Sequence, residues 1–320
     1  MPPSRQPGNE TAPAPDTGQR GGSINSKYLR MGDLYWLRNL FFSSRRAVEG
    51  QYAGRHASSA RGHSVEFNDY RQYMPGDEIG DVDWKIYARS DKLFIKLFEH
   101  QSDMTVNLLV DASASMAYSG LNGGVSKYDH ACQMAAAIAF LTTKQTDKVS
   151  FGVAQEGLKG FLPPYGSFGH FCNILRVMEE QRPAGQARLA EALKKTATLI
   201  SRRGLLILFS DLLDDNEAIL DALNIFSHRG SEVILFHVLH TDELTLPDLN
   251  EALFVDSESA RRLPVNVGDL REAYRRRIDE FLETWSATSK RRGIDYKMVS
   301  TAVNYCDALE QYLFQRASMA

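Results

Sequence analysis

One acid and two hydroxyls follow an apolar strand in the first half of the chain and form its clearest chemical motif. The run TVNLLV at residues 105–110 is typical of a central parallel strand, and it leads directly into Asp111, Ser113 and Ser115. Open parallel sheets bind their ligands just beyond the carboxyl ends of such strands. Mg²⁺ is a hard cation that takes oxygen ligands and keeps some of its waters. The spacing therefore predicts a magnesium site that water or an outside carboxylate completes.

The same three residues also have a plainer interpretation. Ser and Asp are preferred wherever a strand turns into a helix, because their side chains accept hydrogen bonds from unpaired backbone N–H groups. The buried strand that precedes Asp111 favours the metal site over this purely structural role.

Charge is unevenly spread along the second half of the chain. Residues 205–258 hold twelve acids against one base, Arg229, whereas residues 261–297 hold ten bases against six acids. Such runs are usually solvated helix faces or loops. The cluster Asp211, Asp214 and Asp215 differs because it directly follows another apolar strand. At that place it would raise the negative potential around a bound cation.

The composition is that of an ordinary globular protein. The chain has 320 residues, is 43% hydrophobic and 24% charged, and carries a net charge of −3, which gives no reason to expect a nucleic-acid partner. No apolar run approaches the roughly eighteen residues of a membrane span, and the first residues lack a signal peptide, so we expect a cytoplasmic protein with no integral membrane segment. We expect Cys132, Cys172 and Cys306 to be buried small apolar residues.

The chain divides into four parts. Residues 1–24 are rich in proline and small residues, which predicts a disordered tail. Residues 25–47 contain an apolar pattern of helical period at 28–42, which predicts an amphipathic helix packed on the core. Residues 48–102 are dense in glycine and paired charges and predict a β-rich segment with a tight turn at 74–77. Residues 103–320 form the fourth part.

Two questions stay open in the β-rich segment. Its charged residues between Glu66 and Arg89 form either an ion-paired clasp under a hairpin or a recognition surface. His56 and His63 have no second ligand at metal spacing, so we expect no metal there.

From residue 103 onward, strands and helices alternate. We expect strands at 106–110, 149–153, 157–162, 205–209, 233–239 and 296–300, and helices that begin at 126 and span 168–180, 189–200, 216–227, 269–289 and 307–316. Ser126 is the expected cap of the first helix, and Pro163 and Pro164 are expected to end the strand before them. This alternation predicts an α/β fold, a Rossmann-like mainly parallel sheet with helices on both faces.

A succession of motifs in the β-rich segment resembles a known family. The chain carries Gly54-Arg55-His56, Glu66-Phe67, Tyr70-Arg71, Pro75-Gly76-Asp77, Asp83-Trp84 and Lys96-Leu97-Phe98-Glu99, followed by Asp111-Ala-Ser113-Ala-Ser115. This succession resembles the domain-of-unknown-function family fifty-eight (DUF58), over roughly residues 48–316. The Asp-x-Ser-x-Ser spacing is also similar to the metal-ion-dependent adhesion site of von Willebrand factor A domains.

The resemblance implies a von Willebrand A-type domain preceded by a small β-rich element. It further implies a cytosolic adaptor that binds protein partners, works with a MoxR-type AAA+ ATPase or its client, and uses a metal ion. Applied to this sequence, the adhesion-site pattern assigns Asp111, Ser113, Ser115 and Asp211 to Mg²⁺. The pattern's threonine is missing, because Ala187 stands at the comparable place and has no oxygen to offer. Arg188 beside it would bring positive charge towards the ion, so we expect the metal to bind weakly or not at all.

Two function classes follow. The first is a non-enzymatic interaction module whose polar face binds an acidic residue of a partner. The second is a metal-dependent phosphohydrolase with Asp111 as nucleophile, because an acid at the end of the first strand of a Rossmann-like sheet also suits that chemistry. Such an enzyme needs a second acid two residues on, and that position is Ser113. The interaction module is therefore the favoured prediction.

Overall fold

A six-stranded sheet forms the centre of the computed structural model, which describes residues 26–37, 40, 42, 65–72, 94–100, 104–200, 203–255 and 261–318. The strand order is β10-β7-β6-β3-β4-β5, and every neighbouring pair is parallel except β4 with β5. The strands are β3 (Thr105–Asp111), β4 (Lys148–Ala154), β5 (Leu158–Tyr165), β6 (Leu205–Ser210), β7 (Glu232–Leu239) and β10 (Asp295–Ser300).

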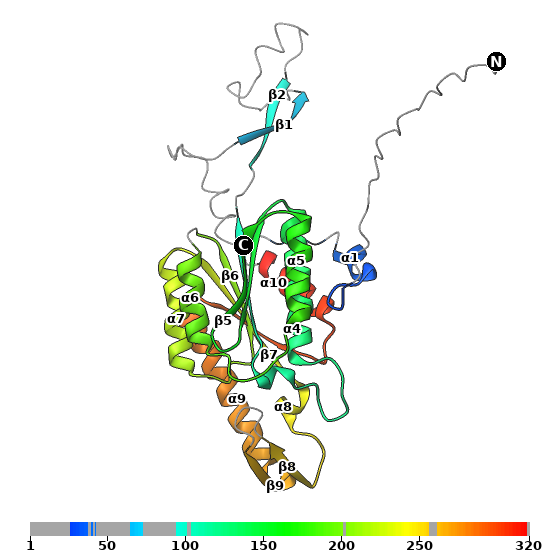
Figure 1. The fold of residues 1–320 in the computed structure, drawn as a ribbon, viewed down its shortest axis with the longest axis vertical. Helices are drawn as coiled ribbons and strands as arrows, with labels where there is room; N and C mark the ends of the chain where they lie inside the picture. Colours follow the sequence, from blue (N-terminus) through cyan, green and yellow to red (C-terminus); the bar gives the residue numbers. More distant parts are fainter. Residues whose placement is uncertain are drawn as a thin grey trace, which may run out of the picture.

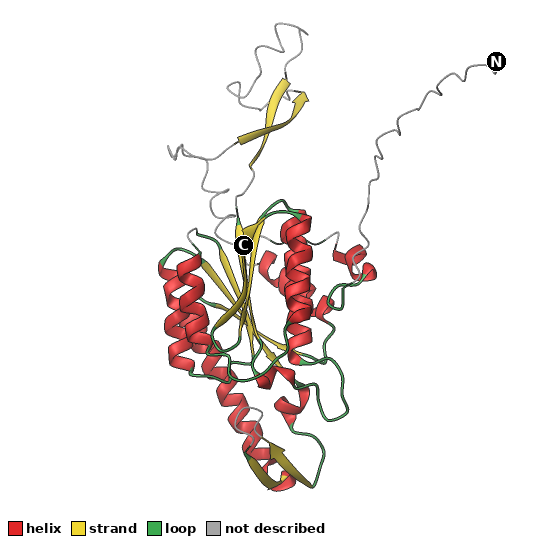
Figure 2. Cartoon of the chain, in the orientation of Figure 1, coloured by secondary structure: helices red, strands yellow, loops and turns green. Residues whose placement is uncertain are grey.

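Helices cover both faces of this sheet (Figures 1 and 2). One face carries α4 (Lys127–Lys144), α5 (Phe168–Glu180) and α10 (Tyr305–Ser318), and the other carries α6 (Leu189–Leu199), α7 (Asn216–His228) and α9 (Val267–Arg291). The predicted α/β fold, with a mainly parallel sheet between two helical layers, is confirmed.

Alternation along the central strands explains the two layers. In β3, Val110 packs with the α4 side of the core, whereas its neighbour Leu109 packs with the α6 side. Successive side chains of a strand point to opposite faces, so a strand with helices on both faces must be apolar at every position. Every residue of β3 and of β6 is buried.

The first helix is shorter than the sequence predicts. A helix was expected over residues 28–42, but α1 spans Met31–Leu37. Tyr28 lies before it in a bend of the chain, where its hydroxyl donates to Asp129 and its ring is buried against α4. These tertiary contacts outweigh the local helical pattern. The predicted packing on the core is confirmed, since Leu37 and Phe42 are also buried there.

Two elements of the fold were missed and one was placed wrongly. The missed elements are the short helix α8 (Thr241–Thr245) and the hairpin of β8 (Glu251–Val255) and β9 (Arg262–Asn266). The prolines Pro163 and Pro164 were expected to end a strand, yet they lie inside β5. Prolines are tolerated there because β5 is an edge strand, and its register with β4 shifts between Leu162 and Tyr165, where the two prolines lie.

Part of the sequence interpretation lies outside the described residues. This holds for the tail at 1–24, the turn at 74–77, the two histidines His56 and His63, and the side chains of the proposed ion-paired clasp. Within the β-rich segment the structure describes one antiparallel pair, β1 (Val65–Gln72) with β2 (Phe94–His100). Cys132 is buried as expected, but Cys172 is exposed, so that prediction was wrong for Cys172.

Candidate functional site

The Asp-x-Ser-x-Ser motif lies at the carboxyl edge of the central sheet. Asp111 is the last residue of β3, and the neighbouring strand β6 ends at Ser210, immediately before Asp211. A short 3-10 helix at Ala114–Ala117 begins within the motif, with Ser113 just before it and Ser115 inside it. Figure 1 shows α8 and the β8–β9 hairpin beyond the same end of the sheet. The edge therefore collects side chains from four separate parts of the chain.

Asp111 is buried and both of its carboxylate oxygens accept hydrogen bonds. Oδ1 accepts from the backbone N–H of Ser113 at 2.8 Å, and Oδ2 accepts from the hydroxyl of Ser210 at 2.6 Å. The pKa of Asp111 is raised to about 7, first by burial and then by the negative charge of Asp211, although the bonds from Ser210 and Ser113 oppose the shift. The bond from the Ser113 N–H is the one that the plainer, structural interpretation of the motif predicted.

The two serine hydroxyls of the motif lie side by side. Their oxygens are 3.0 Å apart and share a hydrogen bond, and Ser113 is buried while Ser115 is half-buried. Oxygens that occupy adjacent corners of a magnesium octahedron are roughly 3.0 Å apart, since each is about 2.1 Å from the ion. The hydroxyl pair therefore fits one edge of such an octahedron.

Asp211 is engaged by a lysine rather than left free for an ion. Nζ of Lys127 donates to Oδ2 of Asp211 at 2.8 Å and also to Oε1 of Glu243 in α8. Both partners of the Lys127–Asp211 pair are buried, with side-chain exposures of 0% and 2%. Burial alone would lower the pKa of Lys127, but the charges of Asp211 and Glu243 outweigh it and the pKa is raised. The lysine is therefore charged.

Asp211 is also held through its backbone. Nε2 of His237, in β7, lies 3.0 Å from the carbonyl oxygen of Asp211, and Nδ1 lies 2.7 Å from the hydroxyl of Tyr296. Because a carbonyl only accepts, Nε2 must carry the proton and Nδ1 accepts from the tyrosine. Burial lowers the pKa of His237 to about 4, so the ring is neutral at physiological pH.

The loop that was expected to lack a threonine packs against the motif. The backbone N–H of Ala114 donates to Gly185, and the N–H of Ala184 donates to Ala112. Ala187 is buried in the same loop and brings a methyl group, not an oxygen. Arg188 does not act as expected, because its side chain is half exposed and forms an ion pair with Glu156 at 3.7 Å.

The neighbouring acids have capping roles. Asp214 accepts from the backbone N–H of Leu189 at the start of α6, and Asp215 caps α7 by accepting from the N–H groups of Glu217 and Ala218. Both satisfy backbone groups that a helix start leaves unpaired. These two carboxylates therefore contribute to helix starts.

The fit to a metal ion is partial. Asp111, Ser113 and Ser115 supply a carboxylate and a correctly spaced hydroxyl pair, whereas Asp211 is bound to Lys127 and Ala187 supplies nothing. Within the part of the chain that the structure describes, no group of three or more His, Cys, Asp or Glu side chains has the arrangement of a metal site. Any ion on this edge would depend on Asp111, on the two hydroxyls and on outside ligands.

A match to a family model shows which protein family this chain belongs to. Residues 69–284 match the family described as "Protein of unknown function DUF58". The chain belongs to the DUF58 family. A relative is the uncharacterized protein Rv1480 of Mycobacterium tuberculosis, which is 27% identical over 226 residues, or 70% of each chain.

Solved structures similar to this DUF58 protein include two proteins of low sequence identity. BatB of Bacteroides thetaiotaomicron is 14% identical, with a TM-score of 0.44 over 68% of this chain and 100% of that one. The VWA domain of SpRpn10 is 11% identical, with a TM-score of 0.41 over 65% of this chain and 94% of that one.

Sequence reasoning missed Lys127, Ser210, His237 and Glu243 as members of the site. One signal was available for Lys127. It is the first residue of α4, directly after the cap Ser126, and a cation is unfavourable at a helix start. A lysine at such a place indicates a specific anionic partner. The sequence offers no comparable signal for the other three residues.

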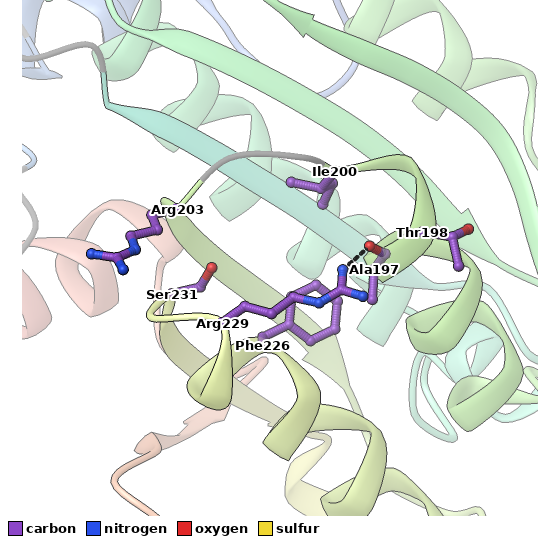
Figure 3. A pocket seen from close by; sticks show the side chains of 7 residues that line it. All are labelled: Ala197, Thr198, Ile200, Arg203, Phe226, Arg229 and Ser231. Atoms are coloured by element: carbon purple, nitrogen blue, oxygen red, sulfur yellow. Dashed lines mark hydrogen bonds between the residues drawn. The ribbon is translucent and has the colours of Figure 1, made fainter. Parts of the chain in front are cut away.

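A hollow of about 630 Å³ lies at the opposite end of this DUF58 protein, where α6 ends and β6 begins (Figure 3). Arg229 reaches into it and donates to the carbonyl of Ala197, while Arg203 points away from Arg229. The residues that line this hollow include none of the motif residues. In the described parts of the chain, no helix combines the length and apolar character that a membrane crossing requires.

Proposed function

We propose that this DUF58 protein is a non-enzymatic protein-interaction module that docks its partner on the carboxyl edge of the central sheet. One observation carries this proposal: exposed apolar side chains gather at that edge. Among the described residues, fourteen large apolar side chains are exposed, and ten of them belong to the edge loops and the adjoining hairpin segment. These are Leu121, Val125, Leu213 and Val303 in the loops, and Leu249, Leu253, Phe254, Val255, Leu263 and Leu270 around the hairpin.

The arrangement is that of an interaction surface. Exposed apolar side chains that gather around polar groups mark sites where another protein binds, because burying them in a complex removes apolar area from water. Here Leu121 and Leu213 are 59% and 55% exposed, and both lie in the loops that follow β3 and β6. The polar motif would orient the partner, and the apolar rim would contribute affinity.

For the metal, we propose weak binding of Mg²⁺ by Asp111, Ser113 and Ser115, with a carboxylate of the partner completing the shell. The 3.0 Å separation of the hydroxyl oxygens supports this arrangement. The raised pKa of Asp111 opposes strong binding near neutral pH, because a proton must leave before the ion binds. The family resemblance leads us to propose a MoxR-type AAA+ ATPase or its client as the partner.

The alternative role as a phosphohydrolase has weaker support. Asp111 is only 2% exposed, and both of its oxygens accept hydrogen bonds within the protein. A nucleophilic carboxylate needs an oxygen that can reach the phosphorus atom of the substrate. Lys127, the lysine near the motif, is bound to two acids and is not available to grip a phosphate. The cytoplasmic location and the absence of a nucleic-acid partner stay predictions from the sequence.

Binding measurements with a purified MoxR-type ATPase test this proposal. Leu121→Asp should weaken the complex at least about tenfold, since it places a charge in the docking face. Leu199→Asp is the matched control, because Leu199 is an exposed leucine at the end of α6, away from the motif. Equal binding by both variants would remove the carboxyl edge as the docking face. Phosphatase turnover that disappears in Asp111→Ala would replace the module with an enzyme.

A further inference from the structure

The ammonium group of Lys127 occupies an unusual position for a charged side chain. It is fully buried, and it contacts one acid that follows β6 and another in α8. Lysine is almost never fully buried unless it is paired, because removing an ammonium group from water is unfavourable. The structure thus places a permanent positive charge beside the acid that the adhesion-site pattern assigns to a metal ion.

We infer that Lys127 is a built-in cation that takes the place of the metal ion at Asp211, and so keeps the affinity of this face for divalent cations low. The inference deepens the proposed function by naming the residue that governs metal binding at the same edge. It concerns the chain's own residues, and it holds whether or not the wild-type protein binds Mg²⁺.

The hydrogen bonds of Asp211 support the inference. Oδ2 accepts from Lys127, and Oδ1 accepts from the backbone N–H of Leu213 at 3.3 Å. An ion that used this carboxylate would have to displace the ammonium group or approach it closely. Like charges at short range in a poorly solvated interior repel strongly, so the bound lysine and a divalent ion compete for Asp211.

Glu243 makes displacement of the lysine still less favourable. Its Oε1 contacts Lys127, while its Oε2 accepts from the backbone N–H of His240 and completes the capping box of α8. Moving the ammonium group would leave Glu243 and Asp211 facing each other without a cation. The contact between Lys127 and Glu243 therefore couples the ion-free state of Asp211 to the position of α8, which lies beside the docking face.

Metal binding by four proteins tests this role of Lys127, with Mn²⁺ as the probe and electron paramagnetic resonance as the readout of free ion. Lys127→Met removes the charge and keeps most of the side-chain length. It should bind Mn²⁺ at least about tenfold more tightly than wild type, because Asp211 becomes a free ligand. Lys127→Met/Asp211→Asn should lose that gain. Lys127→Arg keeps the charge and should bind as wild type does.

Three outcomes would overturn the inference. They are Mn²⁺ affinity in Lys127→Met that equals wild type, a gain that survives Asp211→Asn, and an equal gain in Lys127→Arg. Wild type that binds no Mn²⁺, together with Asp211-dependent binding in Lys127→Met, would end the proposed weak magnesium site and still support the inference.

A measurement on the wild-type protein covers the case in which Lys127→Met does not fold. The ammonium hydrogens of a buried, ion-paired lysine exchange slowly with water, so its ¹⁵Nζ resonance can be followed by nuclear magnetic resonance. Titration with Mg²⁺ should leave the Lys127 resonance in place and protected. Loss of its protection at millimolar Mg²⁺ would show that the ion takes Asp211 and would overturn the inference.

Discussion

Asp111 and Asp211 are buried acids at the ends of β3 and β6, which are neighbours in the sheet. Asp111 is surrounded by neutral donors, the hydroxyl of Ser210 and the backbone N–H of Ser113. Asp211 faces the ammonium group of Lys127 instead. Two acids at neighbouring strand ends, Asp111 level with Ser210 and Asp211 one residue further on, are therefore stabilised in different ways.

The difference teaches what each acid is able to do. Burial and then the negative charge of Asp211 raise the pKa of Asp111 to about 7, and its neutral donors offset only part of this rise, so the charge state of Asp111 responds to its surroundings. A buried ammonium group cancels the charge of Asp211 locally and fixes its geometry. Asp111 is thus the acid able to respond to a ligand, whereas Asp211 has a structural role.

The largest expected effect comes from breaking the ion pair between Asp211 and Lys127. Lys127→Ala leaves Asp211 buried without a cation, and we expect it to lower the free energy of unfolding by about 3–5 kcal/mol. Chemical denaturation measures this change. Lys194→Ala, on the exposed side of α6, should change stability by less than about 0.5 kcal/mol. Equal effects of the two substitutions would contradict the structural role of the Lys127–Asp211 pair.

The pH dependence of stability tests the role of His237, whose ring bonds the backbone carbonyl of Asp211. The pKa of His237 is lowered to about 4 in the folded state and lies near 6.5 when the chain unfolds, so only the unfolded state gains a proton between these values. The stability that His237 contributes is present above about pH 6.5 and is lost as pH falls towards 4, a change of about 3 kcal/mol. His237→Gln should reduce this dependence, and parallel curves for the two proteins would contradict it.

Removal of a neutral donor from Asp111 should have a smaller effect. Ser210→Ala takes away the hydroxyl that donates to Asp111 and also accepts from the N–H of Leu212. We expect a loss of about 1–3 kcal/mol in the free energy of unfolding, measured by urea denaturation. Ser115→Ala is the control, since its half-buried hydroxyl bonds the hydroxyl of Ser113 rather than Asp111. If Ser210→Ala lowers the free energy of unfolding by about 4 kcal/mol or more, Asp111 has a structural role as large as that of Asp211.

The smallest expected effect is the response to Mg²⁺. At about five times the dissociation constant, an ion that binds only the folded state stabilises it by about 1 kcal/mol. Thermal melts with and without Mg²⁺ measure this gain, and Asp111→Ala should abolish it. Persistence of the gain in Asp111→Ala would move the ion away from Asp111 and reverse the roles of the two acids.

The sequence predicted the sheet because its signals are local. Apolar runs such as residues 205–209 form central strands, and Ser126 caps α4 by accepting from the N–H of Asp129, as expected. Asp111, Ser113 and Ser115 were also brought together as predicted, since they follow one strand. Residues close in sequence meet whenever their element forms.

The ion pair escaped prediction because its partners are far apart in the sequence. Lys127 and Asp211 are separated by 84 residues and meet only when α4 packs beside the end of β6. The hairpin of β8 and β9 was missed for another reason. Most of its residues are exposed on both faces, so its apolar residues do not alternate with polar ones as a half-buried strand requires.

The two prolines inside β5 have a consequence for the behaviour of the protein at high concentration. Between the pairs Leu162/Phe151 and Tyr165/Val149, two residues of β5 oppose one of β4, so Pro163 and Pro164 lie in a bulge of the edge strand. A second chain that tried to extend the sheet along this edge would meet missing N–H donors and a bent backbone. This side of the sheet is thus protected against the edge-to-edge aggregation that open parallel sheets invite.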